Sequence, residues 1–281
     1  MSGESATAPA GPVDGALPEE LRARLRPPRS RWRAWRDWLL LAGFAALMVW
    51  AWHGAEMRPL DLVVHSGNIA KLAGDFVPPD FRDWRHYLDE MVVTVHIALW
   101  GTFLAVLASV PCGLLSAANL TPWWIHQPMR RLMDAARAIN ELIFALLFIV
   151  AVGLGPFAGV LALFVHTTGI LAKLFSEVVE AIDPRPVEGV RATGGSRLAE
   201  IRFGVIPQVL PLWVSYALYR FESNVRSATV IGIVGAGGIG MVLHDLMASF
   251  LYQKASAVLI IVVVTVVLID IASAQLRKLL V

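Results

Sequence analysis

A polar and basic segment, residues 187–211, interrupts a chain that is otherwise dominated by long apolar runs. The chain is 57% hydrophobic and 16% charged, whereas a soluble domain carries about 25% charged residues. Apolar surface in this excess requires a lipid solvent. A polar segment cannot lie in hydrocarbon, because each unpaired polar group there costs several kcal/mol. The segment must therefore project from one side of a membrane domain.

The apolar runs predict an all-α integral membrane protein with about six transmembrane helices. Each spanning helix needs about 20 residues, so the runs show where the spans lie but do not fix where each span begins and ends. The fifth run, residues 209–219, covers the beginning of its span. The six runs are residues 38–52, 91–115, 139–152, 157–179, 209–219 and 255–274.

The part of the chain before the second run divides into three. Residues 1–37 are rich in Ala, Gly, Pro, Glu and Arg and predict a disordered, basic cytoplasmic tail. Residues 38–52 predict a first transmembrane anchor, since Trp residues bracket the run and no A-x-A site follows it; a signal-peptide core is the alternative. Residues 53–88 predict a periplasmic segment, in which residues 59–76 have the apolar spacing of an interfacial helix.

The distribution of Lys and Arg orients the predicted spans. If the N-terminus lies inside, the inside segments hold 16 Lys and Arg residues and the outside segments hold 6. This positive-inside bias places both termini and the polar segment in the cytoplasm. The inside segments are residues 1–37, 119–138 (a predicted short basic loop), 181–207 and 275–281.

The polar segment carries the local signals of two short helices joined by a glycine turn. Asp183 can cap a helix that begins at Pro184. Gly194 can end that helix in a left-handed conformation, and Ser196 can cap the next one. Pro207 is expected to mark the turn into the fifth span. An ordinary cytoplasmic connection with a solvated charged face is the alternative.

The same segment resembles the cytoplasmic "EAA" loop of ABC importer permeases. That pattern is Glu-Ala-Ala, three residues, Gly, nine residues, and Ile-x-Leu-Pro. Glu188 matches the Glu, Gly194 the Gly, and Ile206 and Pro207 the final apolar-Pro pair. Gly204 stands where Ile is usual.

The resemblance implies that this loop docks on an ATPase subunit. Gly189 and Val190 replace the two alanines of the family pattern. Small residues would keep the elbow slim enough to enter a cleft, while charged ones offer ion pairs. The implied docking residues are Glu188, Gly189, Val190, Arg191, Gly194, Ile206 and Pro207.

Two further stretches, residues 141–167 and 221–240, look like the phosphonate-uptake branch of these permeases. With the docking loop, the resemblance covers roughly residues 90–275. Asn140 stands where family members often carry Pro. The resemblance implies the type I ABC importer (MetI-like) permease fold for residues 89–281, with the docking loop at 183–207.

The resemblance also implies the function and the partners. The chain would be a homodimeric permease subunit of the bacterial inner membrane that translocates phosphonate or a related phosphorus oxyanion. Two cytoplasmic ATPase subunits and a periplasmic binding protein would complete the importer. The chain has no GxxxxGK[ST] motif, so we expect no catalytic residue and no cofactor here, and ATP and Mg would be used by the ATPase. A net charge of +2 does not indicate a nucleic-acid partner.

Two other functions remain open on the sequence. A permease for methionine or another small solute belongs to the same superfamily. A membrane-embedded enzyme would use His166 and nearby carboxylates, but the sequence has no His, Asp and Glu at metal-ligand spacing and we expect no metal site.

A glycine run after the fifth apolar stretch matches G-x-G-x-x-G at residues 235–240. A dinucleotide site would need an acidic residue about 20 positions further on, and Asp245 comes too early. Glycines also permit sharp turns and close helix approach in a membrane bundle. We therefore expect a hinge or tight packing point in a periplasmic gate, formed by Gly232, Gly235, Gly237, Gly238 and Gly240.

Ionisable residues within the spans are costly and usually face an aqueous path or another polar group. Arg226 is the most attractive substrate contact, since a guanidinium fork suits phosphonate oxygens. An ion pair with Glu222 at i, i+4 is the alternative, and His166 could be a packed polar residue. Lys173 and Arg220 also lie within spans. The candidates for the substrate path are Arg226, Ser227, Glu222, Glu141 and His166.

Overall fold

The computed structural model describes residues 31–280, so the first 30 residues of the predicted tail lie outside the described part. Every regular element within residues 31–280 is helical, which confirms the predicted all-α fold class. The chain divides into two units, Met1–Gly67 and Asn68–Val281.

The first unit holds the predicted anchor. Helix α2 (Arg31–Gly54) extends beyond the apolar run 38–52 at both ends, so its first turns include arginines. Helix α3 (Pro59–Val64) follows, and α4 (Ser66–Asp75) begins after a break at His65. The segment predicted to hold one interfacial helix therefore contains two short helices.

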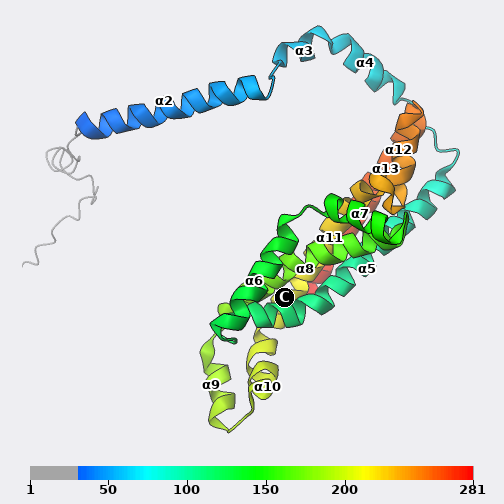
Figure 1. The fold of residues 1–281 in the computed structure, drawn as a ribbon. Helices are drawn as coiled ribbons and strands as arrows, with labels where there is room; N and C mark the ends of the chain where they lie inside the picture. Colours follow the sequence, from blue (N-terminus) through cyan, green and yellow to red (C-terminus); the bar gives the residue numbers. More distant parts are fainter. Residues whose placement is uncertain (1–30, 281) are drawn as a thin grey trace, which may run out of the picture. The chain divides into compact units, whose positions relative to one another are not determined.

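The second unit is a bundle of long apolar helices joined by shorter ones (Figure 1). Its helices, in chain order, are α5 (Trp84–Ser116), α6 (Trp123–Ala138), α7 (Glu141–Val152), α8 (Pro156–Glu180), α9 (Pro184–Ala192), α10 (Arg197–Ala199), η1 (Glu200–Val205), α11 (Ile206–Ile231), η2 (Gly232–Ala236), α12 (Ile239–Ala248) and α13 (Tyr252–Leu280).

Close packing of α5 against α8 builds the centre of this bundle. A Cβ added at Gly101 would lie 2.8 Å from the Leu163 Cβ, and one added at Gly113 would lie 2.8 Å from the Phe175 Cβ. Leu163 and Phe175 are fully buried. Small residues at such contacts let membrane helices approach closely, so that dispersion contacts hold them together where no hydrophobic effect acts between them.

By length and apolar composition, fewer of the described helices qualify as membrane spans than the six predicted. Four described helices are long and apolar enough to cross a membrane, or five if the pair α6 and α7 forms one span. The prediction of about six counted α2, which is not among the four. The Trp residues and His53 in α2 make it less apolar than a typical span, and Trp favours the membrane interface.

The predicted basic loop at residues 119–138 is wrong over most of its length, because α6 is a 16-residue helix. Met133 of this helix is buried, and the helix packs on α8 at Gly169. Helix α7 meets α6 at 89°. Asn140 makes this corner, since its side chain accepts a hydrogen bond from the Leu142 amide at 2.9 Å and caps α7.

Candidate functional site

The polar segment forms a helical elbow at one end of the bundle, with α9 and α10 as its two arms (Figure 1). The predicted local signals are confirmed. The Asp183 side chain accepts from the Arg185 amide at 3.0 Å, and Pro184 is the first residue of α9. Gly194 has a φ of 79°. Ser196 accepts from the Ala199 amide at 3.4 Å.

The expected turn at Pro207 is absent, because α10, η1 and α11 run on as one helical segment from Arg197 to Ala236. The residues before Pro207 are π-helical over Glu200–Val205. A proline removes one backbone donor and crowds the carbonyl four residues earlier, and a local π-helical bulge can accommodate both effects. The second arm of the elbow is therefore an extension of the fifth span.

An ion pair closes the elbow. The Arg191 Nε and Nη2 donate to the two carboxylate oxygens of Glu200 at 2.9 and 3.0 Å. This hydrogen-bonded contact raises the pKa of Arg191. The arms also approach closely at Gly204, where an added Cβ would lie 2.9 Å from the Val187 Cα. Gly204, which stands where the family pattern has Ile, thus makes room for α9.

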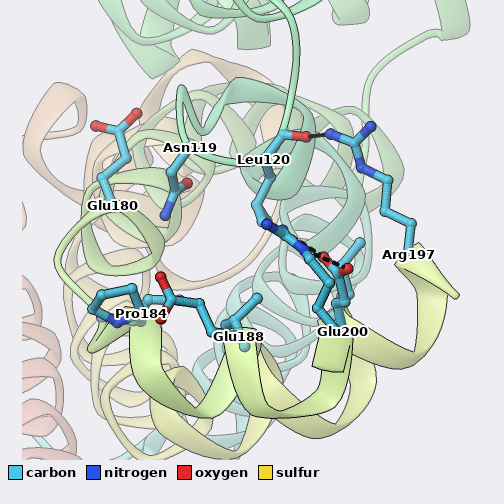
Figure 2. Close-up of a pocket in the computed structure, with 11 residues that line it drawn as sticks. Asn119, Leu120, Glu180, Pro184, Glu188, Arg197 and Glu200 are labelled. Carbon is cyan, nitrogen blue, oxygen red and sulfur yellow. Dashed lines mark hydrogen bonds and ion pairs between the residues drawn. The ribbon is translucent and has the colours of Figure 1, made fainter. Parts of the chain in front are cut away.

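A cavity of about 660 Å³ lies between the elbow and the end of the bundle. Figure 2 shows Pro184 and Glu188 of α9 on one side of it, with Asn119 and Glu180 opposite them. The lining is both polar and apolar, and it combines residues from α9, η1 and the α5–α6 connection. Such a surface can present hydrogen-bonding groups and ion-pair partners to another protein.

The α5–α6 connection is tied to the elbow and to the end of α8 by contacts between residues distant in the sequence. Arg197 donates to the Leu120 carbonyl (Figure 2). The Ala118 amide donates to Glu180 at 2.6 Å, and Arg130 pairs with the same carboxylate. The only sequence signal for this clamp was Glu180 directly after an apolar run, with Arg130 in a neighbouring basic segment.

The predicted docking residues differ in how exposed they are. Glu188, Gly189, Arg191, Gly194 and Pro207 are exposed, while Val190 and Ile206 are partly buried. Two apolar side chains that were not singled out from the sequence are also exposed, Leu198 at 78% and Phe203 at 63%.

Three of the predicted substrate-path residues come together inside the bundle. The Ser227 hydroxyl donates to Glu141 at 2.8 Å, and His166 Nε2 lies 3.3 Å from the other oxygen of that carboxylate. His166 Nδ1 lies 2.9 Å from the Ile139 carbonyl. The cluster thus joins α7, α8 and α11.

The other two candidates form the ion pair that was the alternative to substrate contact. Arg226 Nη1 donates to Glu222 at 2.8 Å, and Arg277 Nη1 lies 3.9 Å from the same carboxylate. Arg226 nevertheless stays 48% exposed and lines a cavity of about 300 Å³ together with Glu141 and Ser227. Within residues 31–280 no group of three or more His, Cys, Asp or Glu residues could hold a metal ion.

The glycine run forms a tightly held turn between α11 and α12. Gly235, Gly237 and Gly238 all have positive φ, at 102°, 78° and 76°. A Cβ at Gly240 would lie 1.9 Å from the Thr229 carbonyl oxygen. The Thr94 hydroxyl accepts from the amide of Ile239 at 2.9 Å and fixes the start of α12. The turn requires glycine both for its backbone angles and for its close contacts.

Solved transporter structures share this fold. The MetNI methionine ABC transporter in an inward-facing conformation matches with a TM-score of 0.60 and 20% identity, over 69% of this chain and 95% of the matched chain. A bacterial ABC transporter involved in the import of alginate matches with a TM-score of 0.57 and 15% identity, over 88% and 98%. These likenesses confirm the predicted MetI-like architecture.

Sequence relatives are closer. The chain is 36% identical to the phosphite transport system permease protein PtxC of Stutzerimonas stutzeri, over 84% of this chain and 86% of the relative. It is 58% identical to the putative cryptic phosphonate transport system permease protein PhnE1 of Escherichia coli, over 49% and 66%.

A third relative is named for the import of phosphate. The phosphate-import permease protein PhnE of Mycolicibacterium smegmatis is 36% identical, over 84% of this chain and 44% of the relative. Residues 109–281, which run from within α5 to the end of the chain, match the family described as the inner membrane component of binding-protein-dependent transport systems. The resemblance drawn from the sequence motifs is thereby confirmed, and the chain belongs to this family of transport components.

Proposed function

We propose that this chain is the membrane permease subunit of an ATP-driven importer that carries phosphonate or a related phosphorus oxyanion across the inner membrane. The observation that carries the proposal is 36% identity over 84% of the chain to a permease named for phosphite transport. A permease named for D-methionine transport is 26% identical over 52% of the chain, which makes methionine the weaker alternative.

The elbow is our proposed docking site for the ATPase. It offers exposed charges at Glu188 and Arg191, an exposed apolar side chain at Leu198, and a cavity that a partner segment could enter. ATP and Mg would then be bound by the partner, with no cofactor and no catalytic residue in this chain. We expect two copies of this chain, two ATPase subunits and a periplasmic binding protein in the complete importer, with both termini in the cytoplasm.

The glycine turn is our proposed gate element. Its backbone angles and short contacts favour a tight packing point over a loose hinge. ATP-driven closure of the ATPases would move the docking elbows, and the bundle would tilt to open outward. The cavity lined by Glu141, Arg226 and Ser227 is the proposed start of the substrate path.

Uptake in cells tests the function. Cells that lack their own phosphonate and phosphite importers would express this chain with its ATPase and binding protein. We expect ATP-dependent uptake of radiolabelled phosphite or methylphosphonate, and none when the ATPase carries a disabled nucleotide site. Uptake of methionine without uptake of any phosphorus oxyanion would contradict the proposal.

A further inference from the structure

A second polar cluster lies where α5, α8 and α11 meet, and its hydrogen bonds do not include the substrate-path candidates. Asn224 is its centre and is fully buried. Its side-chain amide donates to the Thr102 hydroxyl at 2.8 Å. Its carbonyl oxygen accepts from the Thr167 hydroxyl at 3.1 Å and from Arg220 Nη2 at 3.2 Å.

This network fixes the orientation of Asn224. The Thr102 hydroxyl donates to the Ala98 carbonyl at 2.7 Å, so its oxygen is left to accept from Asn224. The Thr167 hydroxyl donates to the other end of the amide. The Asn224 carbonyl therefore faces Arg220 and holds one end of its guanidinium. Buried networks with every member satisfied are rigid.

Within residues 31–280 Arg220 has no carboxylate in direct contact, and Glu141 acts on its charge only from a longer distance. Arg220 lies near the middle of α11, which spans Ile206–Ile231. Among the residues that the structure describes, no carboxylate oxygen approaches its guanidinium within 4.0 Å, whereas Arg226 has Glu222 at 2.8 Å. Its Nε is buried and has no hydrogen-bond partner in the described chain.

An arginine placed in this way is costly, because charged side chains in the hydrocarbon region usually pair with one another or face a water-filled path. A merely structural arginine would be expected to have a carboxylate partner, as Arg226 does. A guanidinium offers five N–H donors in a planar fork, which suits the oxygens of a tetrahedral phosphorus oxyanion. Only the contact from Nη2 to Asn224 uses this capacity here.

We propose that Arg220 is a binding residue for the transported oxyanion within the membrane domain, and that Asn224 positions it. This inference rests on the proposed function, since it requires an anionic substrate. The Thr102–Asn224–Thr167 network holds the guanidinium from one side and leaves its remaining donors for the anion. A substrate without an anionic group would give no reason to keep a cation without a close carboxylate at this position.

The test uses the full importer, reconstituted from this chain, its ATPase and its binding protein in proteoliposomes. The decisive variant is Asn224→Asp, which is almost isosteric and places a carboxylate where the Asn224 carbonyl contacts Arg220 at 3.2 Å. An internal carboxylate would compete with the substrate for the guanidinium. We expect uptake of phosphite or methylphosphonate to fall roughly tenfold or more, while ATP hydrolysis persists. Arg220→Gln should have the same effect, and Arg220→Lys a smaller one.

Controls separate binding from structural damage. Lys173→Gln also removes a cation from a membrane helix, but Lys173 already has Glu177 at 3.4 Å, so this variant should keep wild-type uptake. The double variant Arg220→Gln with Asn224→Asp should transport no less than Arg220→Gln alone, because each change takes the guanidinium away from the substrate, one by removing it and the other by pairing it. Independent losses in the double variant would indicate a structural role and overturn the proposal.

The outcomes also distinguish a failure of the proposed function from a failure of the proposed role of Arg220. If the wild-type importer carries no phosphorus oxyanion, both the proposed function and the role of Arg220 are contradicted. If the wild type carries phosphite or methylphosphonate and both Arg220→Gln and Asn224→Asp do so at the same rate, the proposed function stands and the role of Arg220 is wrong.

Discussion

Arg191 and Glu200 join the two arms of the elbow through a bidentate contact at 2.9 and 3.0 Å. The two residues lie on α9 and η1, so the contact fixes the angle between the arms. Arg191 is 66% exposed, whereas the Glu200 side chain is 13% exposed. The carboxylate is thus the enclosed partner, and the guanidinium covers it from the outside.

Breaking this pair should weaken coupling between ATP hydrolysis and transport. We expect Glu200→Gln to reduce uptake while the protein still reaches the membrane, since the bidentate ion pair becomes a hydrogen bond from the guanidinium to a single amide oxygen. The exchanged pair, Arg191→Glu with Glu200→Arg, should recover part of the loss. Uptake and ATP hydrolysis measured in the same proteoliposomes check this, and equal uptake in all variants would show that the pair does not hold the elbow.

Gly194 should tolerate Asn but not Leu. Its φ of 79° is a conformation that Gly and Asn adopt readily, and nothing else in the described chain lies within 4 Å of a Cβ added there. Gly194→Leu should therefore distort the elbow and uncouple transport, whereas Gly194→Asn should keep most of it. Glu188→Lys should also uncouple, because it reverses a charge on the docking surface. Normal uptake by both Gly194→Leu and Glu188→Lys would contradict the docking proposal.

The glycine turn should be intolerant of any side chain. A Cβ at Gly238 would lie 2.4 Å from the Thr94 hydroxyl oxygen, and one at Gly237 would lie 3.1 Å from Pro156. We expect Gly237→Val and Gly238→Val to lose most transport while still assembling with the ATPase. Gly74→Ala is the matched control, since no atom lies within 4 Å of its added Cβ. Wild-type transport by both valine variants would contradict the gate role and show that the glycine turn only connects α11 to α12.

The topology can be tested by labelling single cysteines in a Cys112→Ser background. We expect reagents that cannot cross the membrane to modify cysteines within residues 53–88 in intact cells. A cysteine at Arg197 should be modified only after the membrane is opened, because the excess of Lys and Arg places the elbow inside. Modification of the Arg197→Cys variant in intact cells would reverse the topology and remove the docking proposal with it.

Acid should weaken the contact between Asp83 and Lys254, whose side chains are 2.7 Å apart. The hydrogen bond from Lys254 lowers the pKa of Asp83 below its ordinary value of 3.8. The stability that this pair contributes is therefore fully present above the unfolded pKa and is lost as the pH falls through the lower folded pKa. Thermal unfolding of wild type and Asp83→Asn in detergent should differ at pH 7 and converge at the lowest pH. A constant difference down to that pH would contradict this assignment.

The sequence predicted local features better than contacts between distant segments. Asp183, Gly194 and Ser196 act on residues within three positions of themselves, and their capping roles are confirmed. The clamp between Arg197 and Leu120 joins residues 77 positions apart, and no local pattern indicates it. Helix α6 was missed because its charged residues made it look like a loop, although it packs closely on α8 at Gly169.

The polar residues of the bundle show the same limit. Their chemistry was visible in the sequence, so Glu141, His166 and Ser227 were named among the candidates, but the sequence did not show that these three meet. Spacing on α11 also raised the Glu222–Arg226 pair as an alternative. The spacing could not show that, within residues 31–280, Arg220 has no carboxylate within 4.0 Å, because that depends on which residues of the neighbouring helices face it.

The helical segment from Arg197 to Ala236 is 40 residues long and leaves the helical conformation only at Gly235, next to its end; 40 residues at 1.5 Å per residue span about 60 Å. It begins in the elbow and ends in the glycine turn, with Arg220 between them. A rod of this kind acts as a lever: a small rotation about its middle swings its two ends in opposite directions, with little movement at the fulcrum. A push on the elbow would then reach the far side of the membrane without passing through any flexible joint, and the residues near the pivot would keep their geometry while both ends move.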